Sequence, residues 1–395
     1  MQLLYWLNFL KRNLIGQKTS RVRNNRKRLR SDSYPCVEVL EDRTLLSSVS
    51  IQQLSAGLDP AFSISSVMDA AGDTIVFESD ADLTDNNGDG SFEIFLFEQG
   101  VGLTQITDSA SSSFSPSISP DGNFVAFASF ADHVPDSNTD GNGEIFLLEI
   151  GVGFTQITDT TTGNAGIPEV NHNGTRIPFI MDADLTGGNS DGGDEIFLYD
   201  AATGFTQVTD TNSFLPFTRP RISGDGSRIV FSSDEDLLGD GSNTDGSDEV
   251  FLFEIGSGLT QITSDPTATS FLADINVDGN RIVFDSDGNF TGENSDGSTE
   301  IFTFDIGGGF VQITDTVASG FNISPIISGD GTAIAFQSFD DLTGENSESI
   351  GEVFLFREGE GLTQITNEDA TFESSFATSI NADGTRIGYE SEGNP

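Results

Sequence analysis

Short apolar runs, separated by turn residues, recur along most of this chain. In the run Ile94-Phe95-Leu96-Phe97 both alternating sets of positions are apolar, which predicts a strand that is covered on both faces. Four strands follow one another in the segment that shows the pattern most clearly, at residues 114–119, 124–128, 144–148 and 154–158. Glycines occupy the tight turns, where hairpin connections need a positive φ.

A repeated phrase, Thr-Gln-Ile-Thr or a close variant, marks the fourth strand of each unit. Its glutamines are Gln105, Gln156, Gln207, Gln261, Gln312 and Gln364, separated by 51, 51, 54, 51 and 52 residues. A period near 50 with four antiparallel strands is typical of a propeller blade. The sequence therefore predicts an all-β fold, a β-propeller of four-stranded antiparallel blades. The recurrence of Phe95 and Phe251 at one register position predicts core packing rather than a ligand platform.

The tight turn before the second strand occurs seven times and predicts seven blades. Its glycines are Gly72, Gly122, Gly174, Gly226, Gly279, Gly331 and Gly384. Six blades are complete, whereas the seventh has only two strands, within residues 375–390, before the chain ends. Residues 49–55 have the pattern of a fourth strand, so we expect them to pair beside this C-terminal hairpin and close the ring. The chain is about one strand short of seven full periods, and the seventh blade is expected to have three strands or to be truncated.

Charge divides the chain into two parts. Ten of the 17 Lys and Arg residues precede residue 44, and the rest of the chain has seven Arg, no Lys and a formal charge of −52. Residues 1–48 are therefore interpreted as a basic, largely disordered leader and residues 49–395 as a single propeller domain. The acidic domain repels nucleic acid and anionic lipid, and it attracts cations or a basic partner.

The leader contains a segment with a recognisable pattern. Residues 40–46, Leu-Glu-Asp-Arg-Thr-Leu-Leu, resemble the L-E-P/D-R-x-L-L segment near the N-termini of large exported bacterial proteins. This resemblance implies export to the periplasm, the cell surface or the medium. A plain secretion signal is not indicated, because the apolar run precedes the basic tract. No apolar run is long enough to predict a membrane span, and Cys36 alone forms no internal disulfide.

The turn and second strand carry a further resemblance. The phrase S-P-x-I-S-x-D-G-x-x-I-x-F, at residues 115–127 and near 324–336, resembles the TolB-like β-propeller repeat. The resemblance extends from about residue 50 to the end. It implies an extracytoplasmic propeller that binds a protein or another ligand, without implying one activity.

Acidic loops follow the second strand of six blades. They contain Asn-x-Asp-Gly-x-x-Glu in the first five blades and a degraded form in the sixth, and strand parity places all of them on one face of the ring. In the first two loops an additional Asp gives D-x-N-x-D-G-x-x-E, which resembles the calcium loops of integrin-type propellers. The candidate ligands are Asp85, Asn87, Asp89, Glu93, Asp136, Asn138, Asp140 and Glu144.

Two interpretations of these loops stay open. Oxygen ligands at this spacing suit Ca²⁺, the one cofactor that the sequence suggests, in a structural role. Alternatively, Asn and Asp cap turns through local hydrogen bonds and Glu begins the third strand.

The first strands break the repeat at one position. The residue before the central Ile or Val is charged in three consecutive blades, as Glu169, Arg221 and Asp274, and Arg219 is close by. These side chains are expected near the central channel, either as a ligand site or as a mutually neutralising cluster.

The function predicted from these observations is binding. His133 and His172 are the only histidines, and neither has a nucleophile motif beside it. We therefore expect an exported, monomeric, non-enzymatic propeller that serves as a binding or scaffold module for a protein or carbohydrate partner, and the negative charge of the domain would suit a basic partner. The alternative is a propeller hydrolase, similar to a lactonase or glycosidase, that uses channel carboxylates or a metal.

Overall fold

A computed structural model describes residues 36–41, 50–54, 62–214, 217–317, 320–347, 349–367 and 374–391. The chain forms two compact units, residues 1–32 and 33–395, and all described residues belong to the second. The disorder predicted for the leader concerns residues that mostly lie outside the described part, as do residues 42–46 of the sorting segment. Among the described residues, no helix has the length and hydropathy needed to cross a membrane.

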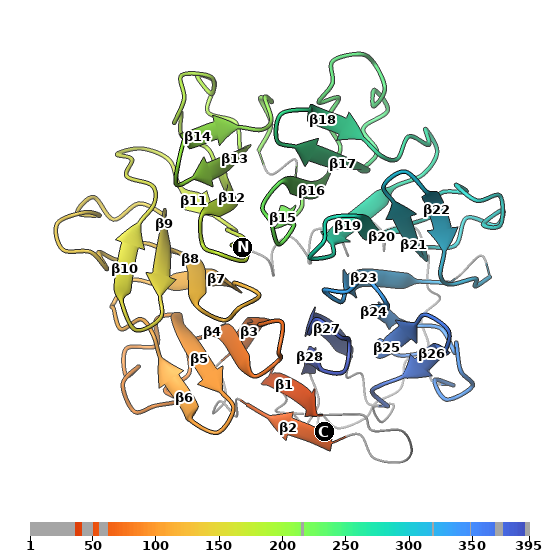
Figure 1. Cartoon of the computed structure of the whole chain (residues 1–395), viewed down its shortest axis with the longest axis horizontal. Helices are drawn as coiled ribbons and strands as arrows, with labels where there is room; N and C mark the ends of the chain where they lie inside the picture. Colours follow the sequence, from red (N-terminus) through yellow and green to blue (C-terminus); the bar gives the residue numbers. More distant parts are fainter. Residues whose placement is uncertain are drawn as a thin grey trace, which may run out of the picture. The chain divides into compact units, whose positions relative to one another are not determined.

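The described residues form seven four-stranded antiparallel sheets, which confirms the predicted all-β propeller of four-stranded antiparallel blades. Six sheets are blades made of four consecutive strands (Figure 1). The strands of the first three blades are β3 (Ser63–Met68), β4 (Thr74–Ser79), β5 (Glu93–Glu98), β6 (Gly102–Gln105), β7 (Ser113–Ile118), β8 (Phe124–Ser129), β9 (Glu144–Glu149), β10 (Gly153–Gln156), β11 (Ala165–Gly166), β12 (Arg176–Met181), β13 (Glu195–Asp200) and β14 (Gly204–Gln207).

The next three blades follow the same order. Their strands are β15 (Arg221–Ile222), β16 (Arg228–Ser233), β17 (Glu249–Glu254), β18 (Gly258–Gln261), β19 (Ser270–Ile275), β20 (Arg281–Ser286), β21 (Glu300–Asp305), β22 (Gly309–Gln312), β23 (Asn322–Ile327), β24 (Ala333–Ser338), β25 (Glu352–Arg357) and β26 (Gly361–Gln364). Figure 1 shows the first strand of each blade nearest the centre of the ring and the fourth strand at its rim.

The remaining sheet combines both ends of the second unit. Its strand order is β2 (Ser50–Gln53), β1 (Cys36–Glu41), β28 (Ile387–Ser391) and β27 (Ser375–Ile380). As predicted, β2 belongs to the same sheet as the C-terminal hairpin and is its fourth strand. The prediction that residues 49–55 lie beside the hairpin is wrong, because β1 lies between them and pairs with β28 on one side and β2 on the other. The sheet therefore has four strands rather than three, and it begins upstream of the predicted boundary at residue 49.

Phenylalanine stacking across each blade builds the core. In six blades a Phe of the second strand lies directly opposite a Phe of the third, as in Phe77 and Phe95, whose ring centroids are 5.7 Å apart. Both rings are fully buried, and so is Phe251, which confirms their predicted packing role. Aromatic and β-branched pairs across strands stabilise a sheet and fill the space between sheets.

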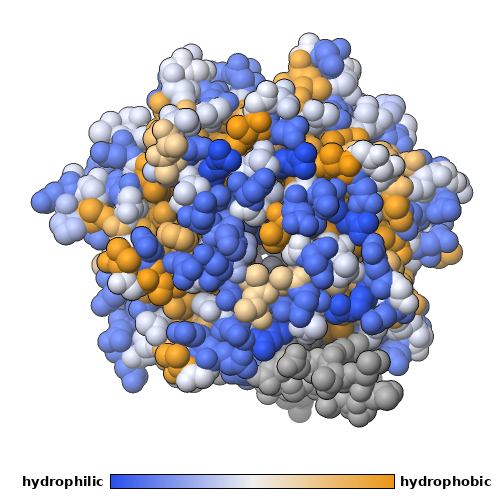
Figure 2. All heavy atoms as spheres, in the orientation of Figure 1, coloured by the Kyte–Doolittle hydropathy of each residue, from blue (hydrophilic) through white to orange (hydrophobic). Residues whose placement is uncertain are grey.

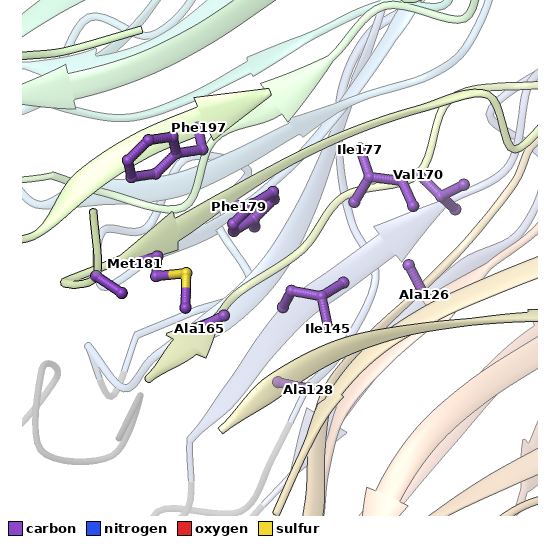
Figure 3. Close-up of a cluster of buried hydrophobic side chains, with 10 residues drawn as sticks. Ala126, Ala128, Ile145, Ala165, Val170, Ile177, Phe179, Met181 and Phe197 are labelled. Carbon is purple, nitrogen blue, oxygen red and sulfur yellow. The ribbon is translucent and has the colours of Figure 1, made fainter. Parts of the chain in front are cut away.

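Neighbouring blades share their hydrophobic cores. The cluster in Figure 3 joins Ala126 and Ile145 of the second blade to Val170, Phe179 and Met181 of the third. Small side chains on one blade face large ones on the next, so the two sheets can pack closely against each other. Each blade is thus covered on both faces, as its apolar pattern predicted.

The tight turns form a second set of links between blades. Their main-chain groups bond around the channel, as in Gly224 N–H to Val277 O at 2.8 Å and Val277 N–H to Gly329 O at 3.1 Å. Arginines add side-chain links: Arg228 donates to Gly279 O of the next blade at 2.9 Å and pairs with Glu254 of its own blade at 2.8 Å. Arg176, Arg281 and Arg357 reach the turn glycine of the next blade in the same way.

Candidate functional site

The first strands of the blades surround a small central cavity. Its volume is about 120 Å³, and its lining combines turn residues with the inner positions of these strands. One side of the lining carries Glu169, Arg221 and Asp274, and the rest is mainly aliphatic, as at Ile118 and Ile327. A further carboxyl, Asp69, lines the cavity at the first blade, so the cavity is amphipathic and its charged side chains come from the first, third, fourth and fifth blades.

The four predicted channel residues lie together. Arg219 Nη2 is 3.0 Å from Glu169 Oε2, and Arg221 Nη1 is 3.4 Å from the same oxygen. The other side of Arg221 approaches Asp274, with Nε 3.6 Å from Oδ1. Two guanidinium groups and two carboxylates thus alternate along one series of ion pairs, in which Glu169, Arg221 and Asp274 line the cavity and Arg219 does not.

Burial and pairing act on these charges in opposite directions. Burial lowers the pKa of Arg219 although Glu169 opposes this effect, whereas the charges of Asp274 and Glu169 outweigh burial and raise the pKa of Arg221. Burial also raises the pKa of Asp274 against the influence of Arg221. Paired charges of this kind hold one another in place, because removing one partner leaves the other desolvated and uncompensated. A ligand role for the cluster stays a prediction.

Three buried carboxyls in the second strands of their blades were not predicted. Glu78, Asp285 and Glu390 occupy the same register position of the second strand in three blades, and all are buried. Glu78 accepts a hydrogen bond from Ser115 N–H and Asp285 accepts one from Ser324 N–H at 3.2 Å, each in the next blade. In the sequence, an acidic residue within an otherwise apolar strand could have indicated these buried carboxyls.

The bonds to these carboxyls explain their position. Ser115 and Ser324 lie at β-bulges of the first strands and have positive φ values of 51° and 56°. A bulge leaves an N–H group outside the strand ladder, and a buried unpaired N–H is costly. The carboxyl of the preceding blade satisfies that group and so fixes the distance between two blades.

The acidic loop of the first blade folds inward around Asn87. Its amide donates to Ser91 O at 2.8 Å, and its main-chain N–H donates to Asp82 at 3.0 Å. Asp89 is exposed and accepts from Ser91 N–H at 3.1 Å, whereas Glu93 is buried and accepts from Ser109 N–H at 2.8 Å. Local capping, one of the two interpretations of the sequence, is therefore present.

The predicted metal ligands are only partly brought together. Asn87, Asp89 and Glu93 converge on Ser91, which the sequence analysis did not select, and Asp85 is exposed with a positive φ of 63°. In the second loop Asn142 takes the place of Ser91 and contacts Asn138 and Glu144, while Asp136 and Asp140 are exposed. Within the described ranges, no three His, Cys, Asp or Glu side chains are grouped so that they could hold a metal ion by themselves.

Exposed aspartates mark the face that carries these loops. The Asp of the Asn-x-Asp-Gly turn is exposed in all five blades that contain it, at Asp89, Asp140, Asp191, Asp245 and Asp296. The Asp-Gly turns lie at the other end of the blades, where Arg176, Arg228, Arg281 and Arg357 bind neighbouring turns. Figure 2 shows one face of the molecule, and this surface is mainly hydrophilic with scattered apolar side chains.

The two histidines have structural surroundings. His133 packs against Phe127, Phe146 and Phe154, and its Nε2 is 3.1 Å from Ser113 Oγ and 3.0 Å from Ser129 Oγ. Burial lowers its pKa to about 4, so the imidazole is neutral at physiological pH. The His172 N–H donates to Gly224 O at 3.1 Å, as part of the turn contacts between blades.

Known structures share this fold at low sequence identity. An oligogalacturonate lyase from Vibrio parahaemolyticus is similar with a TM-score of 0.53 and 13% identity, over 82% of this chain and 88% of the other. An acylaminoacyl peptidase in complex with Z-Gly-Gly-Phe-chloromethyl ketone has a TM-score of 0.51 and 14% identity, over 80% of this chain and 49% of the other. TolB from Acinetobacter baumannii has a TM-score of 0.43 and 17% identity, over 82% of this chain and 62% of the other.

These similarities show only the fold, a β-propeller with four-stranded blades. The resemblance of the repeat to TolB-like propellers rests on the sequence. No protein-family profile and no curated protein sequence matches the chain.

Proposed function

We propose that this chain is an exported, non-enzymatic β-propeller that serves as a binding or scaffold module and presents its acidic loop face to a positively charged partner. The observation that carries the proposal is the exposed aspartate repeated at the same loop position in five blades, from Asp89 to Asp296. Five equivalent anionic groups on one face favour a partner that makes several contacts at once. Each contact is weak, but together they gain from multivalency and electrostatic steering.

The distribution of positive charge supports this proposal. All seven arginines after residue 44 are engaged within the propeller, five near the turns and two in the channel. None of the arginines that bind turns lies in an acidic loop, so the loop face keeps its negative charge. A partner with clustered Lys or Arg side chains, or with another cationic group, complements this face.

A peptide-binding experiment tests the loop face directly. We expect a synthetic lysine-rich peptide to bind the propeller with an affinity that falls as salt rises. Asp140→Asn with Asp191→Asn should weaken this binding by several-fold. The matched control, Asp121→Asn with Asp225→Asn, removes two exposed Asp charges from Asp-Gly turns at the other end of the blades. An equal loss in both pairs would mean that net charge, and not the loop face, binds the peptide.

The alternative function is hydrolysis in the channel, and the unique cluster of Glu169, Arg219, Arg221 and Asp274 is the observation that favours it. A panel of chromogenic esters, lactones and glycosides, with and without calcium, separates the two functions. The binding proposal expects no turnover that depends on the cluster. Turnover that Glu169→Gln or Asp274→Asn abolishes, while the folded fraction is unchanged, would replace it with the enzymatic function.

A further inference from the structure

Oxygen atoms crowd around one serine hydroxyl in the loop of the first blade. Ser91 Oγ lies 2.8 Å from Asp89 Oδ1, 3.0 Å from Glu93 Oε1, 2.7 Å from Ser109 O and 3.5 Å from Asn87 Oδ1. All four neighbours are acceptors, and two belong to carboxylates. A hydroxyl has one proton and can satisfy only one of them.

The loop of the fifth blade repeats this arrangement with the equivalent residues. Ser298 Oγ lies 2.7 Å from Glu300 Oε1, 3.0 Å from Asp296 Oδ1, 3.1 Å from Asn294 Oδ1 and 3.3 Å from Thr316 O. Two loops separated by about 200 residues of sequence thus place the same four kinds of acceptor oxygen in a cage around a serine hydroxyl. The shared letters are Asn-x-Asp-Gly-Ser-x-Glu, and the fourth blade has them too, at residues 243–249.

The fourth loop supplies an independent sign that a ligand is needed. Asn243 is 3% exposed, its amide nitrogen donates to Ser247 O at 3.0 Å, and its Oδ1 is buried without a hydrogen-bond donor. In the fifth blade the equivalent oxygen, Asn294 Oδ1, points at the serine hydroxyl. By this equivalence Asn243 Oδ1 points into the corresponding cage, where Ser247 Oγ bonds to Asp245 at 2.8 Å. A buried acceptor without a donor calls for a cation or a water.

We propose that the loops of the first, fourth and fifth blades each bind one divalent cation of the calcium class, through Asn, Asp, Ser and Glu side-chain oxygens. Hard cations of this size take six to eight oxygens and tolerate irregular geometry, with water completing the shell. Two carboxylates, an amide oxygen, a hydroxyl oxygen and, in two loops, a main-chain carbonyl fit this chemistry. A water has only two protons and leaves the excess negative charge in place, so a cation satisfies the cage better. The exposed Asp gives the ion a path from solvent.

The second and third loops lack this site for separate reasons. In the second loop the Asn142 amide nitrogen occupies the centre and donates to Glu144 Oε1 and Thr160 O, both at 2.9 Å. Asn138 Oδ1 and Glu144 Oε2 in this loop, and Asn189 Oδ1 in the third, are also buried without a donor. An NH₂ group at the centre of the second loop nevertheless repels a cation. In the third loop Gly193 has no side chain to place there. The sequence favoured the first and second loops as calcium sites. The structure favours the first, fourth and fifth loops instead.

The experiment compares two charge-matched double variants of the full chain. The test pair is Asp245→Asn with Asp296→Asn, and the control pair is Asp140→Asn with Asp191→Asn. Each substitution keeps an oxygen that can accept from the turn N–H, so folding should be preserved. Calcium chloride, magnesium chloride and sodium chloride are compared at matched ionic strength, by calorimetric titration and by thermal unfolding, up to about 10 mM divalent ion.

The parent should bind about three calcium ions, the control pair about three and the test pair about one. Calcium should raise the unfolding midpoint of the parent well above the other two salts, because ligand binding to the folded state stabilises it. If the test pair does not fold, Ser247→Ala with Ser298→Ala replaces it, with the same expected loss. Equal midpoint shifts in all three salts, or an equal loss of calcium by test and control pairs, would overturn the proposal.

Discussion

The main-chain N–H of Ala382 donates a 2.9 Å hydrogen bond to Ala70 O and so joins the last turn of the ring to the first. The two residues are 312 positions apart in the chain. Equivalent turn-to-turn bonds link the other neighbouring blades, with one exception among the described residues. Between the second and third blades this bond is absent, because Pro120 occupies the position of the donor and has no N–H. The ring is thus closed by the backbone even where its two ends meet.

Removing β1 and β2 should destabilise the closed ring. A chain that lacks residues 1–54 leaves β28 without its neighbour β1 and reduces that sheet to two strands, which are marginal by themselves. We expect the free energy of unfolding to fall by at least about 3 kcal/mol. Chemical denaturation measures this loss, and deletion of residues 1–32, which form the other unit, is the control. Identical midpoints for the two truncated chains would show that the terminal strands do not hold the ring.

Acidic conditions should stabilise the propeller through Glu390. Its Oε1 accepts from Ser66 N–H at 3.4 Å across the closure, and burial raises its pKa to about 8, while burial raises that of neighbouring Glu78 to about 7. The folded state therefore binds protons that the unfolded state, with a carboxyl pKa near 4.3, has released. This stability is fully present below about pH 4 and is lost as the pH rises through 7 to 8. Each unit of raised pKa corresponds to about 1.4 kcal/mol.

Thermal unfolding from pH 5 to pH 9 measures this dependence. Glu390→Gln keeps the volume and an acceptor oxygen but cannot ionise, and Gln337 occupies the same position in another blade. The variant should lose part of the dependence and should be more stable than the parent at pH 9. Glu149→Gln removes one charge from an exposed position and should leave the slope unchanged. If both variants behave alike, general charge repulsion dominates.

Arg228 should be replaceable by neither Ala nor Lys without loss of stability. Its planar group donates to Glu254 through Nε and Nη2 and to Gly279 O through Nη1, which one ammonium group cannot reproduce. Because the side chain is about a quarter exposed, we expect a modest cost of about 1–2 kcal/mol for either change. Urea denaturation measures it. A Lys variant as stable as the parent would show that charge alone suffices.

His133→Leu should leave the propeller folded and at least as stable. Leucine occupies the equivalent position in other blades, as at Leu83 and Leu185, and both pack against the core of their own blades. The substitution removes a neutral imidazole from an aromatic pocket and leaves Ser113 and Ser129 bonded to each other at 2.9 Å. Differential scanning calorimetry at pH 7 and pH 4 is the measurement. A loss above about 2 kcal/mol would show that the His133 contacts to the two serines matter more than packing.

Much of this architecture could be predicted because its signals are local. The alternation of apolar residues defines strands, glycine defines turns, and a period near 50 defines blades, all within segments of a few residues. The positions of Glu169, Arg221 and Asp274 could be predicted as well, because equivalent strands meet at one channel. The acidic loops could be placed on one face by strand parity alone.

The features that the sequence did not reveal depend on contacts between distant segments. The short run at residues 36–41 becomes a strand because the edge of β28 accepts it, and nothing in its own pattern matches the repeat. Glu390 binds a bulge 324 residues away, so its role depends on how the ring closes. Ser91 differs little from other loop serines until the fold brings four acceptors around it. Local periodicity determined the blades, and tertiary packing decided how their ends join and which polar groups meet, because burial makes each unsatisfied group costly.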